Sequence, residues 1–154
     1  HSPEIETKVL HRETLVLIAS AASVQRMPGL KLKARMPLAA LAELPLILPS
    51  RPNAFRILID TELDHLGHKP KIVLEVDGLN AILELVGEGL GFAVLPPYTL
   101  RNFGTTHDFT THRIEKPKLT SQLMLVWSAR RPTTQTQKKA MDIVKQVVLK
   151  AIET

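Results

Sequence analysis

The segment Ser50-Arg51-Pro52-Asn53 contains side chains that suit the binding of a small anion. It follows an apolar run that predicts a buried strand, and a helix is expected to begin near Pro52. The first turn of a helix has unpaired N–H groups at the positive end of the helix dipole, which attract a carboxylate. Ser50 or Asn53 could donate a hydrogen bond to such a ligand, and Arg51 could pair with it bidentately. In the alternative interpretation, Ser50 only caps the helix and Arg51 faces solvent.

Two further loops also follow predicted strands. Asp77-Gly78 precedes a predicted helix, so Asp77 could be its N-cap or could border a ligand. Pro96-Pro97-Tyr98 follows the next strand and predicts a rigid wall beside the same site. The Tyr98 hydroxyl could reach a ligand, or Tyr98 could pack on the surface. The sequence leaves both alternatives open for each loop.

The sequence contains no pattern typical of a catalytic or metal centre. It has neither a nucleophile elbow nor a Ser/His/Asp arrangement. His65 and His68 are three residues apart, but no third ligand accompanies them. The spacing of Gly87, Gly89 and Gly91 differs from the dinucleotide fingerprint and ends a helix rather than beginning one. We therefore expect a non-enzymatic binding protein without catalytic residues, metal or cofactor.

The elements that position these loops alternate between strand and helix. Residues 73–96 predict a strand, a helix, a glycine-rich break and a second strand. So short a crossover predicts two parallel strands that are neighbours in one sheet. Loops at the carboxyl ends of such strands commonly bind small ligands. The three candidate loops are therefore expected at one rim.

The remaining segments predict further strands and helices. Strands are expected at 14–18, 46–48, 111–114 and 122–128, and helices at 52–66 and 134–152. Segments 21–37 and 98–108 predict irregular structure. The last helix has a wide apolar stripe, formed by Ala140, Ile143, Val144, Val147, Val148, Ala151 and Ile152. Because few other elements can cover this stripe, we expect a homo-oligomer.

The amino-acid composition predicts a globular protein without a membrane-spanning segment. A chain of 154 residues with 44% hydrophobic and 23% charged residues is typical of a globular protein. The absence of cysteine fits the cytoplasm, and no apolar run reaches the roughly 18 residues of a membrane span. Residues 117–154 carry the whole net charge of +5, which could form a nucleic-acid-binding surface or a solvated helix face; the lack of interleaved aromatic residues favours the solvated face. The chain begins with His1 rather than methionine, so we expect a fragment.

The order of these motifs resembles the effector-binding region of LysR-type transcriptional regulators. The most specific segments are Leu-Ala-Glu-Leu-Pro-Leu-Ile-Leu-Pro-Ser at 41–50 and the glycine-rich stretch that ends at Pro96. Leu-Glu-Val-Asp at 74–77 lies between them, and the amphipathic helix at 134–152 follows. The resemblance covers essentially the whole chain.

The resemblance implies an α/β fold of the type II periplasmic-binding-protein kind. It implies one lobe with a mixed, mostly parallel sheet and flanking helices, plus part of a second lobe. Residues 1–12 would be the crossing segment and remnant of lobe I, 13–116 would be lobe II, and 117–154 would return to lobe I. The N-terminal winged helix-turn-helix of the family would lie outside this chain, so contact with DNA is expected only through that missing domain.

The function implied by the resemblance is the sensing of a small, often anionic, metabolite. The effector would contact Ser50, Arg51, Pro52, Asn53, Asp77, Gly78, Pro96 and Tyr98. An alternative is a solute-binding protein of a transport system, which shares the fold. A secretory signal upstream of His1 would favour the transport protein, whereas a helix-turn-helix there would favour the regulator.

Overall fold

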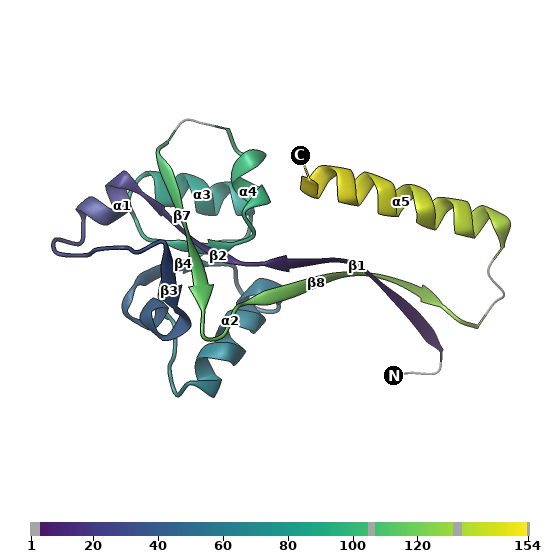
Figure 1. Cartoon of the computed structure of the whole chain (residues 1–154), viewed down its shortest axis with the longest axis horizontal. Helices are drawn as coiled ribbons and strands as arrows, with labels where there is room; N and C mark the ends of the chain where they lie inside the picture. The colour runs from purple at the N-terminus through teal and green to yellow at the C-terminus, as the bar shows by residue number, and fades with distance from the viewer. Residues whose placement is uncertain (1–3, 105–106, 131–133, 154) are drawn as a thin grey trace. The chain divides into compact units, whose positions relative to one another are not determined.

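A computed structural model describes residues 4–104, 107–130 and 134–153 of the chain. The chain divides into two compact units (Figure 1). Unit 1 comprises His1–Glu13 and Gln122–Thr154, and unit 2 comprises Thr14–Ser121. The assignment of these parts to two lobes, with boundaries after residues 12 and 116, stays a prediction.

Unit 2 is an α/β unit built on six strands. The strands are β2 (Val16–Ser20), β3 (Arg35–Pro37), β4 (Pro45–Leu48), β5 (Lys71–Glu75), β6 (Ala93–Leu95) and β7 (Phe109–Glu115). Four of them form a sheet in the order β3-β7-β2-β6, and β4 pairs with β5. A parallel bridge between Leu46 and Phe92 joins β4 to β6. The pairing is mixed, because β2 runs antiparallel to β6 and β7 while β3–β7 and β4–β5 are parallel. The predicted fold class is therefore confirmed.

The prediction that the strands flanking the 79–87 helix are neighbours is wrong. β5 and β6 run parallel, but β4 lies between them and pairs with both. The crossover helix therefore passes over one strand before the chain rejoins the sheet. Close packing of β4 on β6 requires Gly91, because a Cβ there would lie 2.7 Å from the carbonyl oxygen of Pro45.

Five helical segments surround the sheet. They are α1 (Ala21–Gln25), the 3₁₀ segment η1 (Leu38–Glu43), α2 (Ala54–His65), α3 (Leu79–Gly87) and α4 (Tyr98–Arg101). α1 and α4 lie in segments that the sequence predicted as irregular. α1 begins with a capping box in which Ser20 and Ser23 satisfy each other's backbone N–H groups.

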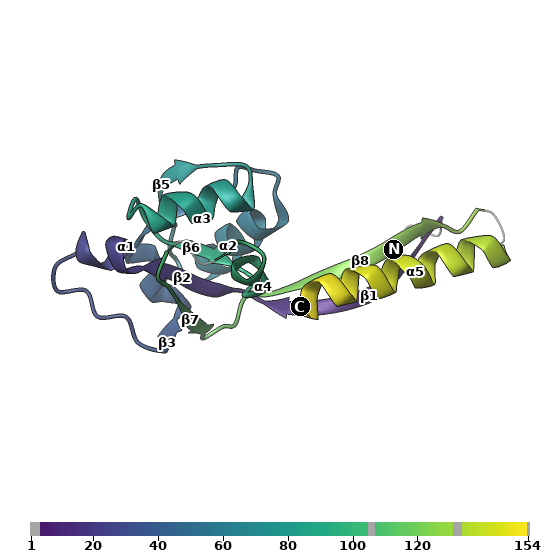
Figure 2. The same cartoon turned by 90° about the horizontal axis from the view of Figure 1, so that it is seen from above.

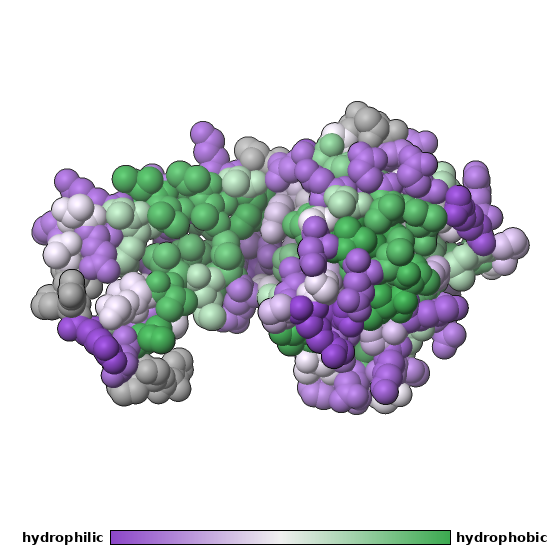
Figure 3. Space-filling model, turned by 180° about the vertical axis from the view of Figure 1, so that it is seen from behind, coloured by the Kyte–Doolittle hydropathy of each residue, from purple (hydrophilic) through white to green (hydrophobic). Residues whose placement is uncertain are grey.

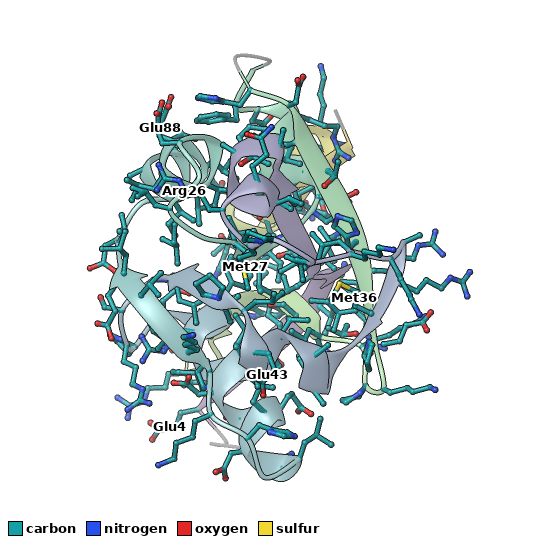
Figure 4. All side chains as sticks on the ribbon, turned by 90° about the vertical axis from the view of Figure 1, so that its left-hand side faces the viewer. Glu4, Arg26, Met27, Met36, Glu43 and Glu88 are labelled. Carbon is teal, nitrogen blue, oxygen red and sulfur yellow. The ribbon has the colours of Figure 1, made fainter. Side chains whose placement is uncertain are left out.

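The sheet of unit 2 buries both of its faces. Leu15, Leu17 and Ala19 join one apolar cluster, together with side chains of η1 and α2. Val16 and Ile18 join the cluster on the opposite face, which α3 covers (Figure 2). Met36 of β3 also points into the core (Figure 4). Burial on both faces explains why residues 15–19 are a continuous apolar run rather than an alternating one.

The described residues of unit 1 form two long strands and one helix. β1 (Ile5–Thr14) and β8 (Thr120–Ser128) form a two-stranded sheet, and Thr14, Thr120 and Ser121 of these strands belong to unit 2. α5 (Gln135–Glu153) matches the helix predicted at 134–152. None of the described helices combines the length and the hydropathy that a membrane span needs.

The apolar side chains of unit 1 remain largely exposed. Figure 3 shows them as an apolar surface over this unit. The exposed large apolar residues of this unit are Ile5, Val9, Leu123, Met124, Val126, Ile143, Val144 and Val147. Three of them, Ile143, Val144 and Val147, belong to the predicted stripe of α5.

Candidate functional site

Three parallel strands end at the same rim of unit 2. β4 and β5 are in parallel register, with Leu48 opposite Glu75, and β6 is parallel to β4. The loops that begin at Ser50, Asp77 and Pro96 follow the carboxyl ends of these strands. The expectation that the candidate loops share one rim is therefore confirmed. Their role in effector binding stays a prediction.

Ser50 and Asp77 form the polar centre of this rim. The Ser50 hydroxyl lies 2.6 and 2.7 Å from the two carboxylate oxygens of Asp77 and donates to that group. The Ser50 backbone N–H donates to the same carboxylate at 3.0 Å. These side-chain and backbone hydrogen bonds hold the pKa of the Asp77 carboxyl below its usual value. Asp77 is therefore an exposed, ionised acceptor, and Ser50 retains acceptor lone pairs on its oxygen.

Asn53, rather than Ser50, caps α2. Its Oδ1 atom accepts hydrogen bonds from the backbone N–H groups of Phe55 and Arg56 at 2.8 and 3.4 Å. The prediction that Ser50 caps this helix is therefore wrong, whereas its role in effector binding stays a prediction. The Asn53 cap also leaves fewer free N–H groups at the start of α2 than the sequence suggested.

The start of α3 is open, in contrast to that of α2. Its N-cap residue is Gly78, with a φ of 134°, and no side chain bonds to the first-turn N–H groups. The interpretation of Asp77 as the cap of this helix is wrong, because its carboxylate bonds to Ser50. In the part of the chain that the structure describes, no side chain caps the first turn of α3, which begins at Leu79, two residues after Asp77.

A network of ion pairs, which the sequence did not reveal, supports the 49–53 loop. The Arg56 side chain is nearly buried, and its Nε lies 3.0 Å from Asp60 Oδ2. Its Nη1 donates to the Pro49 carbonyl oxygen and to Glu75, both at 3.2 Å. Arg51 is exposed and pairs with Asp60 at 2.9 Å. The only signal in the sequence was the spacing of Arg56 and Asp60 by four residues on a helix.

The remaining candidates contribute backbone shape. The Pro96 carbonyl oxygen accepts hydrogen bonds from the Thr99 N–H at 3.1 Å and from the Thr99 hydroxyl at 2.7 Å. Pro96 is buried, and the half-buried Tyr98 begins α4. Pro52 follows a cis peptide bond with Arg51. Pro52 and Pro96 lie in two of the loops that begin at this rim.

The described part of the chain contains no group of three or more His, Cys, Asp or Glu residues that could hold a metal ion. His107 packs edge-on against Phe109 and lies 3.5 Å from Glu84. His112 is buried in β7, which lies between β3 and β2. Its ring nitrogens lie 2.6 Å from the Lys33 carbonyl oxygen and 2.9 Å from the Thr110 hydroxyl.

The sequence of this chain matches a known protein family and a known bacterial regulator. The sequence pattern of the family described as LysR substrate binding domain matches residues 1–148. The nitrogen assimilation regulatory protein Nac of Escherichia coli is 26% identical over 132 residues. That alignment covers 84% of this chain and 41% of Nac, so the chain spans less than half of the length of this curated relative.

Solved structures share the fold. The regulatory domain of Synechocystis CcmR, in complex with 2-PG, superposes with a TM-score of 0.76 at 19% identity, over 96% of this chain and 68% of that chain. The effector-binding domain of QuiR, in complex with shikimate, gives a TM-score of 0.74 at 21% identity, over 96% of this chain and 66% of that chain. At these identities the likeness establishes the fold alone.

Proposed function

The chain belongs to the LysR substrate-binding domain family, and from this premise we propose that it senses a small hydroxylated organic acid for a transcriptional regulator. In this proposal it binds the effector without chemical conversion, in the bacterial cytoplasm and as a homo-oligomer. DNA would be contacted by a separate winged helix-turn-helix domain of the regulator. Binding would shift the equilibrium between two lobe arrangements and so change the affinity for DNA.

The observation that carries the proposal is the Ser50–Asp77 pair beside the uncapped start of α3. Backbone N–H groups at a helix start are suited to hold a carboxylate or phosphoryl oxygen. Asp77 is ionised and repels a second anionic group, but its oxygens accept hydrogen bonds from neutral hydroxyls. A ligand that matches both features has its charged group towards α3 and a hydroxyl group towards Asp77.

The similar structures support the size and class of this ligand. The CcmR and QuiR domains are in complex with 2-PG and shikimate, which are small molecules. The alternative, a solute-binding protein of a transport system, is not favoured, because the matching family and Nac are regulators. The type of segment encoded upstream of His1 distinguishes a regulator from a transport protein.

Loss of one backbone donor tests this proposal. Proline is tolerated at the first helical position and removes its N–H, so Leu79→Pro should keep α3 while removing a ligand contact. Leu79→Ala is the matched control, because it removes the same side chain but keeps the N–H. We expect Leu79→Pro to weaken the binding of shikimate or D-glycerate by about ten-fold relative to Leu79→Ala, since a hydrogen bond to a charged group contributes about 1.5–3 kcal/mol.

Calorimetric titration measures both affinities. A parallel titration with a deoxy analogue of the same acid tests the second contact. Its affinity should be lower than that of the hydroxylated acid, and Asp77→Asn should reduce this preference. Equal affinities for the two Leu79 variants, or a preference that is unaffected by Asp77→Asn, would contradict the proposed binding geometry.

A further inference from the structure

A pocket in unit 2 has a strongly cationic lining. Its volume is about 460 Å³, and its charged side chains are Arg35, Arg113, Lys118 and Glu115. Pro97 of the Pro96-Pro97-Tyr98 loop lines the pocket, but neither Ser50 nor Asp77 does. The pocket is therefore distinct from the Ser50–Asp77 pair.

The sheet itself brings the two arginines together. β3 and β7 are parallel and pair Arg35 with Arg113 in register. The Arg113 N–H donates to the Ala34 carbonyl oxygen at 2.8 Å, which fixes this alignment. Side chains of residues in register on neighbouring strands lie close together, and like charges in that arrangement repel each other. The fold thus holds two guanidinium groups at one opening.

The protein neutralises only part of this charge. Arg35 forms an ion pair with Glu115 at 3.5 Å, and both side chains are accessible to solvent. Across the described residues, Arg113 and Lys118 form no ion pair of their own. Three cations therefore face one carboxylate. An anion with two negative charges would balance the pocket.

The walls between these charges are apolar. Val16, which is in register with Arg113 on the same face of the sheet, lines the pocket and is 8% exposed, and Pro97 also lines it. Thr14, the last residue of β1, adds one hydroxyl group. Apolar walls with a few convergent polar groups are typical of a site for a small organic molecule. A fully hydrated inorganic ion would gain nothing from this surface.

We propose that this pocket binds a small aliphatic dicarboxylate, whose carboxylates pair with Arg113 and Lys118 and whose carbon chain lies against Val16 and Pro97. Arginine suits this task because its planar fork binds a carboxylate bidentately. The proposal does not depend on the effector site at Ser50 and Asp77. Together with the proposed effector site, this pocket gives unit 2 two separate anion-binding sites.

Amide chemical-shift titration of the 154-residue chain with glutarate at constant ionic strength tests the proposal. We expect saturable shifts at residues 113–118 and 35–36. Arg113→Gln should weaken glutarate binding by at least ten-fold. Arg26→Gln is the matched control, because Arg26 is an exposed arginine of the same unit outside this pocket (Figure 4), and it should change the affinity by less than two-fold.

A gain of affinity provides a second test that misfolding cannot imitate. Glu115→Gln removes the one carboxylate in the pocket, so glutarate should bind at least three-fold more tightly. Inorganic phosphate should bind at least ten-fold more weakly than glutarate. Equal losses in Arg113→Gln and Arg26→Gln, weaker binding in Glu115→Gln, equal affinity for phosphate, or shifts confined to Ser50 and Asp77 would each overturn the proposal.

Discussion

The two units of this chain differ in how far their apolar side chains are exposed to solvent. Every described apolar side chain that is buried lies between Leu15 and Leu119, inside unit 2. In unit 1, Ile143 of α5 is 60% exposed and Val126 of β8 is 53% exposed. Unit 2 has helices on both faces of its sheet, whereas unit 1 has two strands and one helix. An apolar stripe is buried only when a second layer covers it.

The difference predicts where the stability of the protein resides. Unit 2 should fold around its own core and hold the rim loops in place, because the loops at Ser50 and Pro96 begin at the ends of strands buried in that core. Unit 1 should gain its remaining stability from contact with a second copy. The experiments that follow compare matched substitutions in the two units or at two sites of one unit.

The largest expected effect is on the core of unit 2. Ile18→Ala removes a fully buried side chain of β2 and should lower the free energy of unfolding by about 2–5 kcal/mol. Ile143→Ala makes the same change at an exposed position of α5 and should cost less than about 0.5 kcal/mol in the monomer. Urea denaturation measures both values. Similar costs for the two variants would remove the distinction between the units.

A smaller effect is expected at the ion-pair network. Arg56→Leu removes a nearly buried guanidinium group that bonds to Asp60, Glu75 and Pro49, and it should cost about 2–3 kcal/mol. Arg51→Leu removes the exposed partner of the same Asp60 and should cost less than about 0.5 kcal/mol. Thermal unfolding at low and high salt distinguishes them. A larger loss of stability for Arg51→Leu would contradict the assigned roles.

Self-association tests the exposed surface of unit 1. Val147→Lys places a charge within the apolar stripe and should weaken the dimer by about ten-fold, because burial of one valine side chain contributes about 1.5 kcal/mol or more. Gln146→Lys adds the same charge one residue away and serves as the control. Sedimentation equilibrium gives the dissociation constants. A monomeric chain at high concentration would contradict the expected homo-oligomer.

The smallest effect concerns the pH dependence of the rim. Because Ser50 holds the pKa of Asp77 below its usual value, the hydrogen-bonded pair stabilises the folded state above the ordinary pKa of a carboxyl group. This contribution is lost as the pH falls through the lowered pKa. Ser50→Ala should raise the pKa of Asp77 towards its usual value, which carboxyl NMR titration would detect. An unchanged pKa would mean that another group controls Asp77.

Local sequence patterns predict the positions of strands and helices better than they predict which strands pair. The apolar run near residues 15–19 and the periodicity of the helix at 134–152 correspond to β2 and α5. α1 was missed because it has only five residues and no apolar period. The order of the strands was missed because periodicity does not show that β4 lies between β5 and β6.

The contacts within the candidate site also could not be predicted from local sequence patterns. The sequence places Ser50 and Asp77 after strands, but the two residues are 27 positions apart. Only the register of β4 and β5, with Leu48 opposite Glu75, brings them together. Arg35 and Arg113 likewise become neighbours through the pairing of β3 with β7. Such contacts depend on strand order and register, which local patterns do not specify.

A map of amide chemical shifts during titration with shikimate tests the central claim most directly. If the rim of unit 2 is the effector site, saturable shifts should gather at Ser50 and at Asp77–Asn80, while α5 remains unaffected. Shifts that gather on unit 1, or no saturable change at Ser50 and Asp77 with shikimate or D-glycerate, would contradict it.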